Sequence, residues 1–146
     1  MSRSGYTQVN KNYMMDNLSI IKNIFQLNNI AVVGMSPKAE RPSNYVALYM
    51  RDQGYNIIPV NPGQKSIQNE MCYPSLTSIP HQVDVVNVFR RSEYVLPIAQ
   101  DAIAIGAKAL WLQDGVINEE ASKIAQEAGL LFIMNDCMLR RHKQLH

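Results

Sequence analysis

Several features that would point to a membrane, a metal or a nucleic acid are missing from this sequence. No apolar run approaches the roughly 20 residues that span a bilayer, and residues 1–10 lack the apolar core of a signal peptide. The 2 cysteines, Cys72 and Cys137, form no CxxC pair, and the 3 histidines show no metal-ligand spacing. A net charge of +2 is too small to indicate nucleic acid binding. We therefore expect a cytoplasmic protein with reduced thiols and with neither a membrane nor a nucleic acid partner.

The glycine-rich motifs of the common nucleotide-binding loops are also missing. Gly34 follows an apolar run at residues 30–33, but no Gly-Lys-Ser/Thr follows at the spacing of a P-loop. Ser36 and Ala39 stand where a dinucleotide fingerprint has its second and third glycines. The next expected strand ends in Val60-Asn61-Pro62, where an acid that binds ribose hydroxyls would be expected. An ordinary NAD(P) site is therefore disfavoured.

What is present is the pattern of one α/β domain. With 146 residues, of which 47% are hydrophobic and 18% charged, the chain has the size and composition of a single globular domain. Apolar runs predict strands at 30–33, 55–60, 83–89, 107–112 and 130–134. Helical periodicity and capping signals predict helices at 14–27, 43–53, 92–105, 118–128 and 138–144. Between them we expect a small extended piece at 67–73 and a short helical turn at 74–79.

This alternation predicts the fold class. Strands that alternate with helices form a parallel sheet with right-handed crossovers. We therefore predict a single Rossmann-like domain, with a parallel sheet of about five strands and helices on both faces. Residues 1–13 are expected to form a flexible tail and residues 14–146 the domain.

The loop after residues 30–33 has the order of elements that α/β folds use to bind phosphate. The buried strand ends at Gly34, a short loop follows, and a helix is expected from about Ser43, with Ser43 or Asn44 as its cap. The amides of such a loop and the positive end of the helix point at one spot. The order of elements indicates an anion site, whereas Gly34 taken alone is equally consistent with a simple turn.

The carboxyl ends of the parallel strands meet at one edge of the sheet, where ligands of this fold class bind. We expect four clusters at this edge: Gly34-Met35-Ser36, Val60-Asn61-Pro62, Phe89-Arg90-Arg91 and Trp111-Leu112-Gln113. Cations there and on the neighbouring loops could contact phosphate, namely Arg90, Arg91, Lys38, Arg41 and Lys65. For Lys38 and Lys65 the alternative is a solvated loop charge, and Trp111 is expected in the core.

No set of catalytic residues is recognisable in the sequence. His81 precedes the third expected strand, the other two histidines lie near residue 146, and no Ser/His/Asp arrangement is apparent. Cys137 follows the fifth expected strand, but a single cysteine without a nearby histidine is more often a packed thiol than a nucleophile. The residues favour a binding site without evident catalysis.

Six blocks of sequence, in order, carry a resemblance to a known family. The blocks are Val33-Gly34-Met35-Ser36, Arg41 to Val46, Gly54 to Pro62, Val83 to Arg90, Ile105 to Gln113, and Ala128-Gly129. Together they resemble the small, free-standing CoA-binding proteins, which are similar to the CoA-binding domain of the succinyl-CoA synthetase alpha subunit. The resemblance covers residues 17–143. It implies a Rossmann-like fold that binds coenzyme A or an acyl-CoA across the strand ends.

The resemblance also implies the residues that contact the ligand. They are Gly34, Met35, Ser36, Pro37, Lys38 and Arg41 in and after the phosphate loop, Asn61, Pro62 and Lys65 after the second strand, and Phe89, Arg90, Leu112, Gln113 and Asp114 along the rest of the groove. Ligase activity is not implied, because the phosphorylated histidine of the synthetase lies in a later domain that these blocks do not include. Two other functions stay open: an enzyme that uses NAD(P) or another nucleotide cofactor, and a regulatory module with a vestigial groove.

Two positions depart from the family pattern. Asn69 stands where the family usually has a glycine, and asparagine tolerates the left-handed backbone conformation. Asn135-Asp136 precede Cys137, where the family usually has Asp-Arg. The second departure removes a cation from the C-terminal end of the domain.

Overall fold

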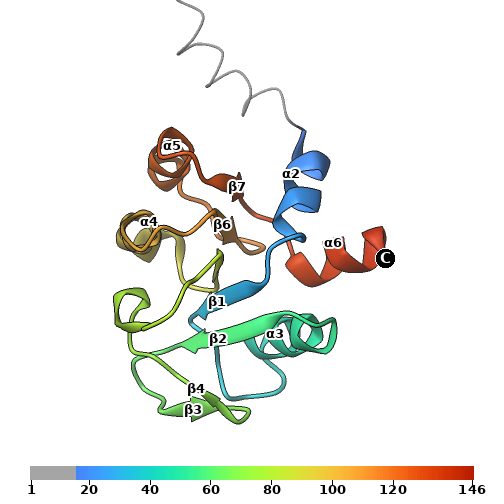
Figure 1. Ribbon diagram of the computed structural model, residues 1–146, viewed down its shortest axis with the longest axis vertical. Helices are drawn as coiled ribbons and strands as arrows, with labels where there is room; N and C mark the ends of the chain where they lie inside the picture. Colours follow the sequence, from blue (N-terminus) through green and yellow to red (C-terminus); the bar gives the residue numbers. More distant parts are fainter. Residues whose placement is uncertain (1–15) are drawn as a thin grey trace, which may run out of the picture.

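The computed structural model describes residues 16–146 as one α/β domain (Figure 1). The expected tail at residues 1–13 and the first positions of the helix expected at 14–27 lie outside the described residues. The sheet contains β1 (Asn29–Val33), β2 (Asn56–Val60), β5 (Val85–Val88), β6 (Ala109–Leu112) and β7 (Leu131–Ile133). All neighbouring pairs are parallel and the strand order is β2-β1-β5-β6-β7. The predicted five-stranded parallel sheet is confirmed.

Within residues 16–146, five helices cover the two faces of this sheet, as expected. They are α2 (Asn17–Ile24), α3 (Pro42–Asp52), α4 (Val95–Ala104), α5 (Glu119–Glu127) and α6 (Met138–Leu145). One core cluster joins α4 and α5 to the sheet, and the other joins α2, α3 and α6 to the opposite face, as Figure 1 shows. Successive residues of a strand point to opposite faces. Because both faces are covered, the strands are buried along nearly their whole length and read as continuous apolar runs.

The segment between β2 and β5 contains small elements. The extended piece expected at 67–73 is a two-stranded antiparallel hairpin, β3 (Ser66–Ile67) and β4 (Glu70–Met71). Its turn is made by Gln68 and Asn69 at φ 52° and 68°. Asn69 therefore adopts the left-handed conformation that the sequence suggests for it. A short 3₁₀ turn, η1 (Leu76–Ser78), follows before β5, and a second one, η2 (Ser92–Tyr94), lies between β5 and α4.

Trp111 lies in the core, as expected, and does not face a ligand. Its side chain is fully buried, its indole N–H donates to the carbonyl oxygen of Asp136 at 2.8 Å, and its ring stacks on Phe25. Within residues 16–146 we find no helix that combines the length and the apolar character of a bilayer span.

The C-terminal helix α6 is fastened to α3 through a buried histidine. His142 is 4% exposed, and its Nδ1 lies 2.9 Å from the hydroxyl of Tyr49 on α3. Its ring stacks on His146 and meets the edge of Phe25. Burial, and to a smaller extent the charge of His146, lowers the pKa of His142 below its ordinary value of 6.5. The folded protein therefore disfavours the charged form of this imidazole.

We predict that the free energy of unfolding falls as the pH drops below about 6.5. With the folded pKa below the unfolded one, the unfolded chain binds the proton first. Stability from this residue is therefore complete above the unfolded pKa and is lost as the pH falls towards the folded pKa. Urea unfolding between about pH 5 and 8 measures the slope. His142→Gln should reduce it and His81→Gln, outside the cluster, should not; equal slopes in both variants and the wild type would contradict the assignment.

Candidate functional site

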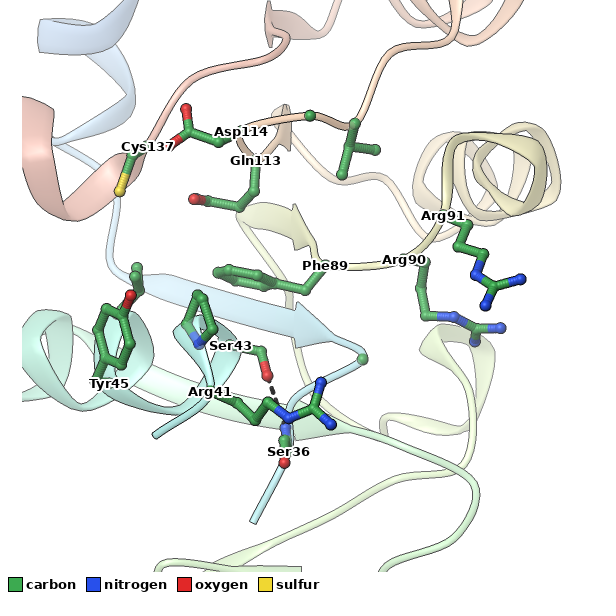
Figure 2. Close-up of a pocket in the computed structure, with 15 residues that line it drawn as sticks. Ser36, Arg41, Ser43, Tyr45, Phe89, Arg90, Arg91, Gln113, Asp114 and Cys137 are labelled. Atoms are coloured by element: carbon green, nitrogen blue, oxygen red, sulfur yellow. Dashed lines mark hydrogen bonds between the residues drawn. The ribbon is translucent and has the colours of Figure 1, made fainter. Parts of the chain in front are cut away.

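A pocket of about 540 Å³ opens at the carboxyl edge of the sheet, beyond β1, β5 and β6 (Figure 2). Of the residues implied by the sequence, it is lined by Gly34, Ser36, Arg41, Phe89, Arg90 and Gln113. It is also lined by Asp114, which the resemblance places along the groove, and by Arg91, which was expected from the sequence as a possible phosphate contact. The other lining residues were not among the expected ligand contacts: Pro42, Ser43, Tyr45, Val46, Gly115, Val116 and Cys137. Strand ends far apart in sequence are thus brought together where the fold class predicts.

The remaining implied residues lie elsewhere. Met35 and Leu112 are buried at 1% and 0% exposure, and Pro62 lines a second, smaller pocket. The exposed residues Pro37, Lys38 and Lys65 line neither of these two pockets. Asn61 is engaged within the protein: its Nδ2 donates to the carbonyl of Met35 at 2.9 Å and its Oδ1 accepts from the amide of Gly63 at 2.8 Å.

Gly34 permits the close contact between the ends of β1 and β5. Its φ is +87°, and a Cβ built on it would lie 2.7 Å from the backbone oxygen of Phe89 and 2.9 Å from Cδ of Arg90. Both the turn and the contact therefore require a residue without a side chain. The aliphatic part of Arg90 crosses the space that a side chain at position 34 would fill.

The loop after Gly34 is held by hydrogen bonds to α3. Ser43 Oγ accepts from the amide of Ser36 at 2.9 Å, and Asn44 Nδ2 donates to the carbonyl of Ser36 at 2.8 Å. The predicted cap at Ser43 or Asn44 is therefore wrong: α3 begins at Pro42, Arg41 occupies the N-cap position, and no side chain caps the helix. Both polar side chains are used to fix the loop instead.

This arrangement changes what the loop offers to an anion. The amide of Ser36 is taken by Ser43, and the amide of Lys38 donates to Ser36 Oγ at 3.1 Å. Two loop amides are thus already paired, while the hydroxyl hydrogen of Ser36 has no acceptor among the described residues. Hydroxyl and guanidinium groups also line the pocket beside this loop, and Figure 2 shows the Ser36–Ser43 bond with Arg41 near it.

The charges that line the pocket are three arginines and one carboxylate. Arg90 lies over the ring of Tyr94, 5.0 Å from its centroid, and Arg41 and Arg91 are exposed at the rim. Asp114 is bound in bidentate fashion by Arg140 of α6, with both N–O distances at 2.9 Å. These bonds hold the pKa of Asp114 below its ordinary value and raise the pKa of Arg140. Because Arg140 neutralises the carboxylate, the pocket favours an anion.

The loop that carries Asp114 is anchored by Asn135 and Asp136, the pair that departs from the family pattern before Cys137. Asn135, at φ 58°, accepts from the amide of Gly115 at 2.7 Å through its Oδ1. Asp136 is buried at 7% exposure and binds Arg140 and Arg141. The positive charge next to Asp136 comes from arginines one turn further along α6.

The two cysteines are free and differ in their surroundings. Cys72 is buried, its Sγ lies 3.5 Å from the carbonyl oxygen of Asn61, and burial raises its pKa. Cys137 is partly exposed, and its sulfur points into the pocket (Figure 2). Within residues 16–146, no group of three His, Cys, Asp or Glu side chains is arranged to hold a metal ion.

A second pocket, of about 120 Å³, adjoins the first at Arg90. Its walls are mostly apolar, with one hydroxyl and one carboxylate: Val33, Val60, Pro62, Pro74, Ser75, Leu76, Arg90, Ile98 and Asp101. β1 pairs with β2 on one side and with β5 on the other. Both pockets include the end of β1 and Arg90, which follows β5, so both border the point where the strand order reverses. Open parallel sheets bind ligands at this point.

The fold and this site define a Rossmann-like domain with an anion-favouring groove at the switch point of its sheet. Comparison with known proteins identifies the family. The chain belongs to the family described as the CoA binding domain, whose model matches residues 28–143. Membership supports coenzyme A binding in general.

Relatives include both stand-alone and larger proteins. The protein YneT of Bacillus subtilis is 41% identical over 123 residues, which are 84% of this chain and 91% of YneT. A solved structure from Pyrococcus horikoshii superposes with a TM-score of 0.85 at 39% identity, over 90% of this chain and 93% of that one. The ADP-forming acetate–CoA ligase II of Archaeoglobus fulgidus is 26% identical over 73% of this chain, which spans only 16% of the ligase. The resemblance to the free-standing CoA-binding proteins is confirmed.

A paired substitution tests the role of Gly34. Gly34 and Gly129 have nearly equal φ values, +87° and +89°, but a Cβ at Gly129 would meet nothing within 4 Å. Alanine at either position should cost about 1–2 kcal/mol of stability through backbone strain. Gly34→Ala should cost more, because it must also displace Arg90 and the end of β5. Urea unfolding of both variants measures the difference in the free energy of unfolding. Equal losses of stability would show that the contact of Gly34 with Phe89 and Arg90 is not tight.

Proposed function

We propose that this protein binds coenzyme A in an extended conformation across the carboxyl edge of the sheet, with its diphosphate near Gly34 and Arg90. The observation that carries the proposal is that a large pocket, of about 540 Å³, and a small one, of about 120 Å³, meet at Arg90. Coenzyme A has the same division: a nucleotide and a long pantetheine arm are joined by a diphosphate. A guanidinium at the junction meets the charged part of such a ligand.

Each pocket suits one part of the ligand. The small pocket has walls formed in part by the apolar residues Pro62, Pro74 and Ile98, which suit the purine base. The large pocket places Phe89 and Val116 beside polar groups, and this mixture fits the pantetheine arm, with or without an acyl group. We assign no catalytic step to the site, since the residues that line it form no nucleophile–base pair.

The same geometry disfavours a dinucleotide. In dinucleotide-binding folds an acid at the end of the second strand binds the ribose hydroxyls. Here Asn61 occupies that position, and both ends of its carboxamide are bonded to the protein backbone. No group at this position is left to take the role of the acid.

We predict that the protein binds coenzyme A more tightly than NAD or NADP. Titration calorimetry with these three ligands, at one salt concentration, measures the order of affinity. Bovine serum albumin, titrated under the same conditions, controls for heats of dilution and unspecific binding. Binding of NAD or NADP that is as tight as that of coenzyme A, or no binding of coenzyme A, would overturn the proposal.

A second prediction concerns Arg90. Replacing it with alanine should weaken coenzyme A binding by about 1.5–3 kcal/mol, the usual value of a charge-assisted hydrogen bond. Lys108→Ala is the matched control, because it removes one positive charge at the opposite edge of the sheet, where Lys108 lines a separate pocket with Asn28 and Asp84. Circular dichroism verifies that both variants fold. If the two substitutions weaken binding equally, Arg90 contributes only its positive charge and makes no specific contact with the ligand.

A further inference from the structure

Gln113 presents a fixed hydrogen-bond acceptor to the large pocket. The residue follows β6 and is 4% exposed, yet it lines the pocket. Its Nε2 donates to Oδ1 of Asn87 at 2.9 Å, inside the protein. Its Oε1 has no partner among the described residues, and Figure 2 shows this oxygen directed into the pocket. A buried carboxamide is thus half satisfied by the protein and half open to a ligand.

The orientation of the Gln113 carboxamide is set by Asn87 and, through Asn87, by Met138. Asn87 lies in β5 at 1% exposure, and its Nδ2 donates to the sulfur of Met138 at 3.7 Å. A thioether can only accept hydrogen bonds, so Asn87 must turn its NH₂ group towards Met138. Its oxygen then faces Gln113, and Gln113 must offer its own NH₂ group inwards. The two ends of a carboxamide are similar in shape, so the chain of partners decides which end faces out.

We propose that Met138, Asn87 and Gln113 form a buried relay that makes Gln113 a specificity-determining acceptor for an amide N–H of the ligand. The inference rests on the proposed function, because it is the pantetheine arm of coenzyme A that supplies such a donor. The arm contains two secondary amides, and each has one N–H group. The diphosphate of coenzyme A has no hydrogen to donate at neutral pH, so the acceptor also directs this anionic part of the ligand towards the arginines.

Gln113 acts on the ligand directly, whereas Asn87 and Met138 act through Gln113 and are positioning residues. Asn87 is opposite Trp111 in the register of β5 and β6, in the middle of the core. A polar side chain there is costly unless it is bonded on both sides, and here both ends of its carboxamide have partners. The role of Asn87 in orienting Gln113 explains why a polar side chain lies among apolar neighbours.

Modified ligands test the relay. The probes are coenzyme A, adenosine 3′-phosphate 5′-diphosphate, which lacks the arm, and two coenzyme A analogues in which one amide N–H is replaced by an ester oxygen. The wild type should bind one of the two ester analogues about ten-fold more weakly than coenzyme A, because an ester oxygen opposes Oε1 instead of donating to it. In Gln113→Met this ratio should fall to about one, while binding of the arm-free nucleotide stays unchanged.

Further variants keep the test decisive. Gln113→Met leaves Asn87 without its donor, so the double variant Asn87→Leu, Gln113→Leu, which removes both partners, is measured beside it. Met138→Leu keeps Gln113 but removes the acceptor that sets its direction, and should reduce the ratio. Gln100→Met, on the exposed side of α4, is the matched control and should retain the wild-type ratio.

The outcomes separate this inference from the proposed function. If the wild type binds coenzyme A but does not discriminate against either ester analogue, or if Gln113→Met and the double variant keep the discrimination, the acceptor role is overturned and coenzyme A binding stands. If Met138→Leu leaves the ratio unchanged, the relay is overturned. If neither coenzyme A nor the arm-free nucleotide binds to the wild type, both the inference and the proposed function are overturned.

Discussion

The contact between the ends of β1 and β5 at Gly34 is the constraint on which the rest of the site depends. The backbone oxygen of Phe89 and the side chain of Arg90 occupy the space that any other residue at position 34 would need. This contact allows the chain to turn out of the sheet at φ +87° and allows Arg90 to lie across the turn. Because the turn lies where the strand order reverses, it also brings the two pockets to a common boundary. A single residue without a side chain thus sets the path of the loop, the place of the cation and the division of the groove.

Around this contact the site is prepared mainly by α3 and α6. The first turn of α3 fixes the loop through Ser43 and Asn44. Helix α6 neutralises the carboxylate of Asp114 through Arg140 and fixes the direction of Gln113 through Met138. A loop and a carboxamide that are already held in place lose little further freedom when a ligand binds, which lowers the cost of association. The hydrogen bonds that occupy the amides of Ser36 and Lys38 therefore make the site more rigid, although they leave fewer backbone donors for phosphate.

The sequence predicts the sheet and its binding edge well, because both follow from local patterns. Continuous apolar runs identify strands buried on two faces, and the residues after them must gather at one edge. It predicts individual contacts less well. Met35 and Leu112 belong to the right clusters but point into the core, since neighbours in an extended chain face opposite sides. Pro42, Tyr45 and Val46 line the pocket from one face of α3, and their spacing in the sequence already indicated that they share a face. The pairs Asp114–Arg140 and Asn87–Gln113 join residues 26 apart and depend on the folded packing, so no local pattern reveals them.

The relation to the acetate–CoA ligases then has a physical interpretation. This chain corresponds to 16% of the ligase of Archaeoglobus fulgidus, so a domain of this size can be one part of a larger protein. The stand-alone relatives, in contrast, are matched over more than nine-tenths of their length. A binding domain within an enzyme can be supported by its neighbouring domains, whereas here hydrogen bonds within the domain hold the loop after β1, the loop after β6 and Gln113. Helix α6 makes three such contacts. Its Arg140 binds Asp114 in the loop after β6, its Met138 accepts from Asn87, which orients Gln113, and its His142 is bonded to Tyr49 of α3. Because the same helix supports the fold and the groove, a ligand that binds only the folded state stabilises both together.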